Sequence, residues 1–245
     1  ELSQVKHHFV HHLLIQDPYN VSRFEMDALE LIAGLFNRHR VVVMAGGSGL
    51  YIDAVCHGID LLPDPDPGIR ADLKELLATS GIGALRDELL LTDPEYAKEV
   101  DLSNPARLIR ALEVCRVTGV PYSALRSNRP KQREFRILKL GLELPRTVLN
   151  ERINSRVDAM MQSGLLHEVR QLLPWSHLNA LNTVGYSELF AYLRGLTTLE
   201  HAVDKIKTHT RRYAKRQMTW FRKDPEMTWF DPGDTGGMIS TVEKY

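Results

Sequence analysis

A short apolar run that ends in two glycines constrains the fold more than any other feature of this sequence. The run extends from Arg40 to Ala45 and is followed by Gly46 and Gly47. It is β-branched and continuous, a pattern typical of a parallel strand buried on both faces. Ser22 is the predicted N-cap of a helix that precedes the apolar run, and the glycines lead from the run into another helix. This order of elements predicts an α/β core.

A proline-rich connector, Leu62 to Pro67, interrupts this pattern. Proline restricts its own φ and disfavours helix at the residue before it, so the connector is expected to be extended. The following residues, 68 to about 125, have helical spacing throughout. We therefore predict core segments at residues 1–62 and 135–245, with a helical insertion at residues 63–134.

Four elements are expected after the insertion. Residues 135–144 and 227–230 have the composition of strands. A long helix is predicted from about Arg146, with Leu149, Ile153 and Val157 facing inward, and a second one from about Leu199 to Phe221. The α/β core thus resumes after the insertion.

The charge balance and the cysteine usage exclude several classes of protein. The chain has 31 basic and 31 acidic residues, so a nucleic acid would have to be held by a local basic patch. Its two cysteines, far apart in sequence, argue against a disulfide scaffold and fit a reducing compartment. No signal peptide or membrane-spanning run is visible. We expect a cytoplasmic protein.

A histidine cluster near the start is the one candidate for a metal site. It consists of His7, His8, His11 and His12. Two pairs have helical i, i+4 spacing, but the neighbouring apolar residues indicate a strand-like passage. We expect no metal site made of this chain's own residues.

The glycine turn, Gly46 to Tyr51, is the first candidate site. It follows the predicted strand, where ligands bind in open α/β sheets. Glycines allow close approach of the backbone, and a helix N-terminus favours anions. The turn fits neither a Walker A loop nor the Gly-x-Gly-x-x-Gly pattern. From the pattern alone, a ligand site and a plain strand-to-helix turn stay equally open.

The segment from Lys205 to Lys223 is the second candidate, because it carries eight basic residues and no acidic one. Its cations are Lys205, Lys207, Arg211, Arg212, Lys215, Arg216, Arg222 and Lys223. Ile206, Tyr213 and Trp220 recur every seven residues and predict one packed face, which leaves basic ridges on the others. A solvated basic face is the alternative, but the absence of acids favours an anionic ligand such as phosphate, pyrophosphate or RNA.

Two arginine pairs have helical spacing. Arg152 and Arg156 lie four apart, and Arg156 borders the expected apolar stripe. We therefore expect Arg156 to be partly buried and to need an anionic partner, either a nearby carboxylate or a ligand phosphate. Arg107 and Arg110 lie three apart on a helix that begins at Pro105, and by themselves indicate only an amphipathic helix.

Taken in order, these segments resemble the tRNA dimethylallyltransferase family. The matching stretches are Val-Lys-His-His (5–8), Asp-Pro-Tyr-Asn (17–20), Ala-Gly-Gly-Ser-Gly-Leu-Tyr (45–51), Asp-Pro-Asp-Pro-Gly-Ile-Arg (64–70), Asn-Pro-Ala-Arg-Leu-Ile-Arg-Ala-Leu-Glu-Val (104–114), Glu-Arg-Ile-Asn-Ser-Arg-Val-Asp (151–158), Thr-Val-Gly-Tyr (183–186) and Ala-Lys-Arg-Gln-Met-Thr-Trp-Phe-Arg (214–222). Each stretch is weak alone. The ordered set covers nearly the whole chain and is specific.

The resemblance implies a P-loop, kinase-like α/β core with a helical insertion that holds the anticodon arm of tRNA. It implies transfer of a dimethylallyl group from dimethylallyl diphosphate to the exocyclic amine of the adenosine adjacent to the anticodon, with Mg²⁺ as cofactor. We expect a monomer. The nearest alternatives are a nucleotide kinase, a prenyltransferase acting on adenine nucleotides, and a non-catalytic tRNA-binding module.

The resemblance also implies roles for individual residues. Ser48 and Arg156 match positions at the reacting groups. The expected diphosphate ligands are Arg152, Arg156, Arg212, Lys215 and Arg216. The expected tRNA contacts are Ser48, Arg107, Leu108, Ile109, Arg110, Thr183, Val184, Gly185, Tyr186, Lys215, Arg216, Gln217 and Arg222.

One departure from the family pattern concerns the phosphate-binding loop. The family opens with Gly-Pro-Thr-x-x-Gly-Lys-Thr and an Asp-Ser segment that supplies the catalytic base, and this sequence contains neither. We therefore expect a truncated form that is inactive as given. We also expect the cations of the two late helices, Arg156 and Lys215 among them, to converge on a pocket beside the glycine turn.

Overall fold

The computed structural model describes residues 4–127 and 129–245. The chain forms two compact units. The first comprises the residues up to Val21, His39–Ile52 and Phe135–Tyr245, and the second comprises Ser22–Arg38 and Asp53–Glu134. The three-segment division made from the sequence stays a prediction.

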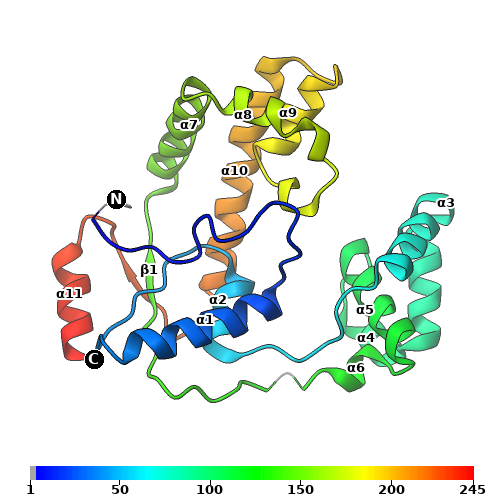
Figure 1. The fold of residues 1–245 in the computed structure, drawn as a ribbon, viewed down its shortest axis with the longest axis horizontal. Helices are drawn as coiled ribbons and strands as arrows, with labels where there is room; N and C mark the ends of the chain where they lie inside the picture. The colour runs from blue at the N-terminus through cyan, green and yellow to red at the C-terminus, as the bar shows by residue number, and fades with distance from the viewer. Residues whose placement is uncertain (1–3, 128) are drawn as a thin grey trace. The chain divides into compact units, whose positions relative to one another are not determined.

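A cluster of helices makes up most of the first unit (Figure 1). It contains α7 (Arg146–Gln162), α8 (Leu165–Gln171), α9 (Tyr186–Leu193) and α10 (Leu199–Phe221), with the short 3₁₀ turns η1 (Leu173–Trp175) and η2 (Asn179–Leu181) between α8 and α9. Their apolar core is built from Val157, Val169, Leu181, Leu189, Phe190, Ala202 and Ile206. The predicted start of α7 at about Arg146 and the predicted bounds of α10 are confirmed.

A small parallel sheet completes the first unit together with α11 (Thr235–Lys244). β1 (Leu140–Leu142) pairs with β2 (Thr228–Phe230), with Gly141 opposite Trp229. Both strands fall within the segments predicted from the sequence, although β1 is shorter than expected. The buried ammonium of Lys139 supports the pairing, since it binds Asp224 at 2.7 Å and Glu226 at 2.9 Å.

The strand expected at Arg40 to Ala45 is not formed, and this prediction was wrong. Residues 41–46 have no regular secondary structure, and the side chains expected to be buried are exposed, with Val41 at 57% and Val43 at 84%. The physical reason is the lack of a neighbour. A buried parallel strand needs ladder partners, and within the described residues β1 and β2 pair only with each other.

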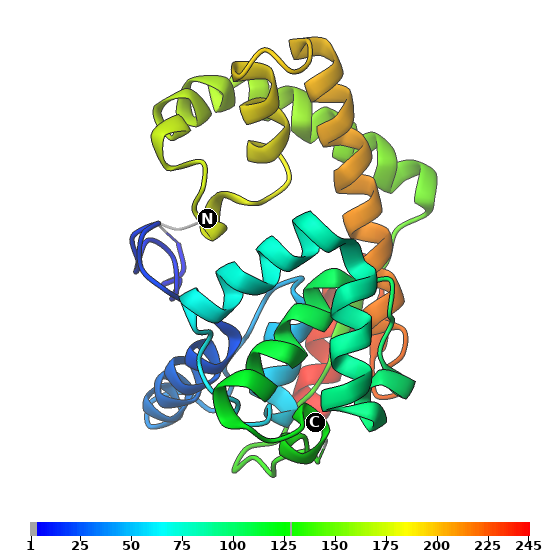
Figure 2. The ribbon, with the colours of Figure 1, turned by 90° about the vertical axis from the view of Figure 1, so that its right-hand side faces the viewer.

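The second unit is helical. It contains α1 (Val21–Phe36), whose first residue belongs to the other unit, and the last part of α2 (Gly49–His57). The remaining helices are α3 (Pro67–Thr92), α4 (Pro94–Glu99), α5 (Pro105–Thr118) and α6 (Tyr122–Leu125). α3 and α5 pack side by side (Figure 2) around a core that includes Leu73, Leu85, Leu89, Leu108 and Leu112.

Three of these helices begin in the same way, with a capping side chain followed by proline. Asp66, Asp93 and Asn104 each accept a hydrogen bond from the backbone N–H three residues later. Proline at the next position lacks only an N–H that no helical partner would satisfy. Ser22, in contrast, lies inside the first turn of α1, because the helix begins at Val21. Its predicted capping role was wrong.

Buried carboxylates hold the second unit together. Glu113 on α5 is fully buried and binds Arg70 of α3 at 2.8 Å and Arg110 at 2.9 Å. Arg110 also donates to the carbonyl oxygen of Pro63 at 2.8 Å, which fastens the proline-rich connector to α5. A second buried carboxylate, that of Glu25 on α1, binds Arg133 at 2.7 Å.

The fold belongs to the α/β class with a helical insertion, as the sequence predicted. It contains more helix and less sheet than expected. None of the helices in the described parts of the chain is long and apolar enough to cross a membrane.

Candidate functional site

The glycine turn of the first unit is held against the C-terminal half of α10. Gln217 donates from its side-chain amide to the carbonyl oxygen of Gly47 at 2.8 Å. A Cβ at Gly47 would lie 1.9 Å from the Gln217 Nε2 atom, and a Cβ at Gly49 would lie 2.4 Å from Cδ1 of Trp220. Both glycines therefore allow close approach of α10 side chains.

Ser48 lies between these two glycines and opens α2. Its backbone carbonyl accepts hydrogen bonds from the N–H groups of Tyr51 and Ile52, both at 3.1 Å. Its side chain is exposed. The turn thus presents a hydroxyl beside the first turn of a helix, where a polar ligand can be bound. The role of Ser48 next to the reacting base stays a prediction.

Two of the predicted cations of α10 are used to bind α7. Lys207 forms an ion pair with Asp158 at 2.6 Å, and Arg211 donates to Asn154 at 2.6 Å. They therefore secure one helix to the other and are not free for a ligand. Of the ridge formed by Lys207, Arg211 and Lys215, only Lys215 remains exposed.

The other ridge of α10 is open. Arg212 and Arg216 are exposed, and the only interaction of either within the described residues is the stacking of the Arg216 guanidinium on the Tyr213 ring, 5.6 Å from its centroid. Neither arginine, nor Lys215, has a carboxylate partner among the described residues. Uncompensated positive charge at helical spacing is the electrostatic signature of an anion-binding surface.

The seven-residue repeat that predicted a packed face of α10 holds only for its first half. Ile206 is 2% exposed, whereas Tyr213 and Trp220 are each 41% exposed. The first half is buried against α7 and α9, whereas the second half stays partly exposed on this face, although Trp220 meets Gly49 at the start of α2. The prediction of one continuous packed face was therefore wrong.

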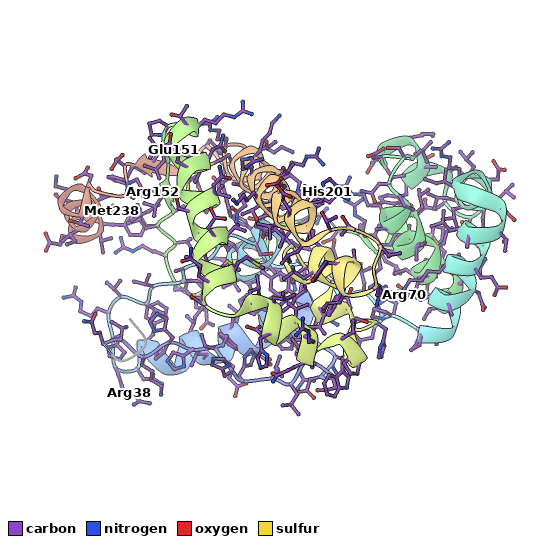
Figure 3. The ribbon with its side chains drawn as sticks, turned by 90° about the horizontal axis from the view of Figure 1, so that it is seen from above. Arg38, Arg70, Glu151, Arg152, His201 and Met238 are labelled. Atoms are coloured by element: carbon purple, nitrogen blue, oxygen red, sulfur yellow. The ribbon has the colours of Figure 1, made fainter. Side chains whose placement is uncertain are left out.

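Arg156 differs from the expectation. It is exposed, and within residues 4–127 and 129–245 it has no anionic partner. The α7 residues that contact α10 are Asn154 and Asp158, and Arg156 lies two positions from each, which places it about 200° around the helix. Figure 3 shows Arg152, which shares this outer face, on the side of α7 away from α10.

The expected convergence of Arg156 and Lys215 is thus not found. Lys215 is two residues from Gln217, so it projects about 200° away from the side chain that binds the glycine turn. Arg216 lies closer, because it is four residues from Trp220 and shares its ridge. The proposed diphosphate contacts of Arg152 and Arg156 stay predictions.

In the second unit, the stretch expected to contact tRNA is largely internal. Leu108 is fully buried and Ile109 is 9% exposed, so their side chains pack in the core. Burial of these side chains does not support their expected tRNA contacts, which stay predictions. Arg110 is occupied by Glu113 and Pro63. Only Arg107 is exposed, and it remains the candidate of this stretch.

The predicted stretch Thr183 to Tyr186 forms the loop that opens α9. Gly185 has φ of 104°, a left-handed conformation that favours glycine, and its N–H donates to Glu188 at 2.7 Å. The Tyr186 hydroxyl donates to the Glu168 carboxylate. Burial and this hydrogen bond raise the pKa of Tyr186 to about 12. Thr183 is exposed at the start of the loop.

The two remaining predicted residues already have partners. Gln217 donates a hydrogen bond to the carbonyl oxygen of Gly47, and Arg222 forms an ion pair with Glu143, which precedes α7 in the chain. Their tRNA contacts stay predictions, and for Arg222 they would require exchange of a carboxylate for a phosphate.

Sequence reasoning missed several polar residues that position these elements. Glu188 and its partner His209 were not singled out, nor was Glu113. One signal was present for Glu188. It follows Gly185 by three residues, the spacing at which a carboxylate at the third helical position reaches back to the N-cap N–H.

A family model described as IPP transferase matches residues 1–224. The chain belongs to this family. It is 50% identical over 231 residues to a tRNA dimethylallyltransferase of Christiangramia forsetii, which covers 94% of this chain and 76% of that protein. A tRNA dimethylallyltransferase 2 of Parabacteroides distasonis is 50% identical over 244 residues, covering 100% of this chain and 82% of that protein.

Solved structures of the family have the same fold. The tRNA isopentenylpyrophosphate transferase of Bacillus halodurans superposes with a TM-score of 0.65 at 35% identity, covering 99% of this chain and 78% of that one. A eukaryotic dimethylallyltransferase acting on tRNA gives a TM-score of 0.74 at 23% identity, covering 99% and 64%, and supports the fold alone. The predicted family is confirmed.

Proposed function

We propose that this protein transfers a dimethylallyl group from dimethylallyl diphosphate to the exocyclic amine of the adenosine adjacent to the anticodon of a tRNA. The family match and its tRNA dimethylallyltransferase relatives support the reaction class. The observation in the structure that carries the proposal is the row of exposed cations, Arg212, Lys215 and Arg216, on the half of α10 that binds the glycine turn.

The chemistry of both substrates fits this surface. A diphosphate and an RNA backbone are polyanions, and exposed guanidinium groups bind phosphate oxygens in bidentate fashion. Because Arg212 and Arg216 have no carboxylate partner among the described residues, binding an anion breaks no existing ion pair. The net charge of zero confines this attraction to the local surface.

In the reaction, the amine nitrogen attacks the allylic carbon, the bond from that carbon to the diphosphate oxygen breaks with its electron pair leaving on the diphosphate, and the amine proton passes to solvent water. Negative charge develops on the leaving diphosphate, and cations at this point lower the barrier. The adenine has to leave its stack to be reached. Ser48, exposed at the turn, is placed to hydrogen-bond a base or a phosphate there.

Magnesium as a cofactor stays part of the proposal. Within the described residues no group of three or more His, Cys, Asp and Glu side chains could hold a metal ion by itself. Because Mg²⁺ is commonly bound by one or two carboxylates together with substrate phosphates, this does not decide for or against the ion, and no step is assigned to it. The proposed substrate places the protein in the cytoplasm, and a monomeric state stays a prediction.

The test is incubation of the full-length protein with labelled dimethylallyl diphosphate and a tRNA transcript that carries adenosine next to the anticodon. Label should appear in the tRNA and be lost when this adenosine is replaced by guanosine. Parallel reactions with labelled ATP and with free adenine nucleotides test the kinase and the nucleotide prenyltransferase. Binding of tRNA without any transfer would overturn the proposal in favour of a tRNA-binding module.

A further inference from the structure

We propose that Glu188 is a positioning residue for tRNA. Its buried carboxylate ties the loop from Thr183 to Tyr186 to His209 of α10, and so sets the loop at a fixed place along the basic face of that helix. This inference rests on the proposed function, because the loop is taken to meet the tRNA.

The contacts of Glu188 join two elements of the first unit. One carboxylate oxygen accepts the N–H of Gly185 at 2.7 Å, and the other lies 2.5 Å from Nδ1 of His209. The side chain of Glu188 is 6% exposed. A carboxylate this deeply buried is costly unless both oxygens are used, and here each has a partner.

The loop is also held by the Tyr186 hydrogen bond to Glu168 and by a backbone hydrogen bond from the Ser187 N–H to the Thr183 carbonyl oxygen at 3.1 Å, and Glu188 adds the acceptor for the buried N–H of Gly185. Gly185 has φ of 104°, so the chain turns sharply there, and its N–H would be buried without an acceptor if Glu188 were absent. Val184 and Tyr186 pack against the core formed by α7 to α10. Thr183 remains exposed at the outer end of the loop. Glu188 therefore fixes the inner end of a loop whose outer end faces solvent.

His209 is the link to the basic surface. Arg216 lies seven residues further along α10, which is two helical turns on nearly the same face and about 10 Å along the axis. Arg212, three residues from His209, lies on the neighbouring ridge. Fixing Gly185 to His209 thus fixes the spacing between the loop and the arginines that have no carboxylate partner among the described residues. A rigid spacing lets both parts engage one RNA backbone without ordering a loop at each binding event.

The residues around this contact argue that it is specific. The buried residues of the core of α7 to α10, Leu181, Leu189 and Ile206 among them, are apolar and offer no alternative hydrogen bond from their side chains. An apolar residue at position 188 would leave the Gly185 N–H unsatisfied. The network therefore tolerates few replacements at this position.

The test compares four variants. Glu188→Gln keeps the shape and an oxygen for Gly185 but loses the charge. His209→Leu removes the donor, and His209→Asn restores an amide N–H near the place of Nδ1. His201→Leu is the matched control, since His201 is an exposed imidazole near the start of the same helix (Figure 3).

We expect His209→Leu to raise the KM for tRNA on the order of tenfold, the effect of losing one charge-assisted hydrogen bond. The kcat at saturating tRNA and the KM for dimethylallyl diphosphate should stay close to wild type. Glu188→Gln should have a smaller effect in the same direction, His209→Asn should restore most of the affinity, and His201→Leu should behave as wild type.

The inference is overturned if tRNA affinity is unchanged in His209→Leu. It is also overturned if, in this variant, kcat falls, the KM values for both substrates rise and the melting temperature falls together. Affinity for tRNA is also measured directly, without the donor substrate. This second readout separates the two proposals. A wild-type protein that binds tRNA but transfers no dimethylallyl group refutes the proposed reaction, while the loss of binding in His209→Leu still supports the positioning role.

Discussion

Gln217 on α10 and Gly47 in the glycine turn are joined by a hydrogen bond of 2.8 Å between the side-chain amide and the backbone carbonyl oxygen. The two residues are 170 positions apart in the chain. The bond therefore fixes the register between the turn that presents Ser48 and the helix that presents Arg216. Trp220, one turn further along, fills the space that a side chain at Gly49 would need.

Replacing either glycine tests this register. Gly49→Ala should destabilise the protein by about 1–3 kcal/mol, because the new methyl group meets the rigid ring of Trp220. Gly47→Ala should cost only about 0.5–1.5 kcal/mol, because the flexible end of Gln217 can move away and only its hydrogen bond is lost. Urea unfolding of both variants measures the difference.

A double variant supplies the control for that comparison. In Gly47→Ala with Gln217→Ala, the clash is absent, so the two changes should cost less together than the sum of their separate effects. Additive costs would show that the two residues are not coupled.

The sequence predicted the long helices well and the buried strand badly, for one physical reason. A helix satisfies its own hydrogen bonds, so the spacing of apolar residues was enough to place the start of α7 and to bound α10. A strand exists only with its neighbours. The apolar run at residues 41–45 could not show whether partners are present, and no pairing forms in the described residues.

In the candidate site, too, the sequence predicted the local helical pattern but not the partners that tertiary packing brings. Helical spacing correctly placed Lys207, Arg211 and Lys215 on one ridge, but spacing alone does not show what lies opposite. Asp158 and Asn154 on α7 occupy two of these side chains. Long-range partners of this kind depend on tertiary packing, which single-sequence periodicity does not contain.

Arg107 and Arg110 should separate binding from stability. Arg107→Ala removes an exposed cation, and is expected to weaken tRNA binding and reduce the salt dependence of that binding without changing the melting temperature. Arg110→Ala breaks the contact with buried Glu113 and should destabilise the protein by about 3 kcal/mol. Binding titrations at several salt concentrations and thermal melts distinguish the two. A loss of stability in Arg107→Ala would contradict the assignment.

Arg212 and Arg216 should act together on RNA affinity. Replacing both by glutamine removes two cations that have no carboxylate partner among the described residues, so the slope of log K against log salt should become shallower by about two. The matched control is Lys207→Gln, since Lys207 is paired with Asp158. An unchanged slope in the double variant, or an equal change in the control, would exclude this ridge as the RNA contact.

Lys139 should stabilise the sheet through its two carboxylate partners. Burial tends to lower the pKa of this ammonium, but the hydrogen bonds that it donates to Asp224 and Glu226 outweigh this effect, and the pKa is raised. Lys139→Met should therefore cost about 1–2 kcal/mol at neutral pH. Glu226→Gln is the control, because that carboxylate is 73% exposed and its loss should cost less than about 1 kcal/mol. Equal costs would show that the buried contact with Asp224 is not the important one.

The Tyr186 hydroxyl should lose its proton only at unusually high pH, which provides a test. Burial first, and then the hydrogen bond to the Glu168 carboxylate, raise its pKa from 10.0 to about 12. Since the neutral phenol is favoured in the folded state, its stabilising contribution is complete below pH 10 and is lost as the pH rises through about 12. Absorbance of the phenolate should therefore show a step near pH 12 that is missing in Tyr186→Phe. In Glu168→Gln, which keeps the burial but removes the charge, this step should move to lower pH without reaching the ordinary tyrosine value. If the step stays in place in Glu168→Gln, burial alone holds the phenol, and the contact between α8 and the Thr183–Tyr186 loop contributes nothing to it.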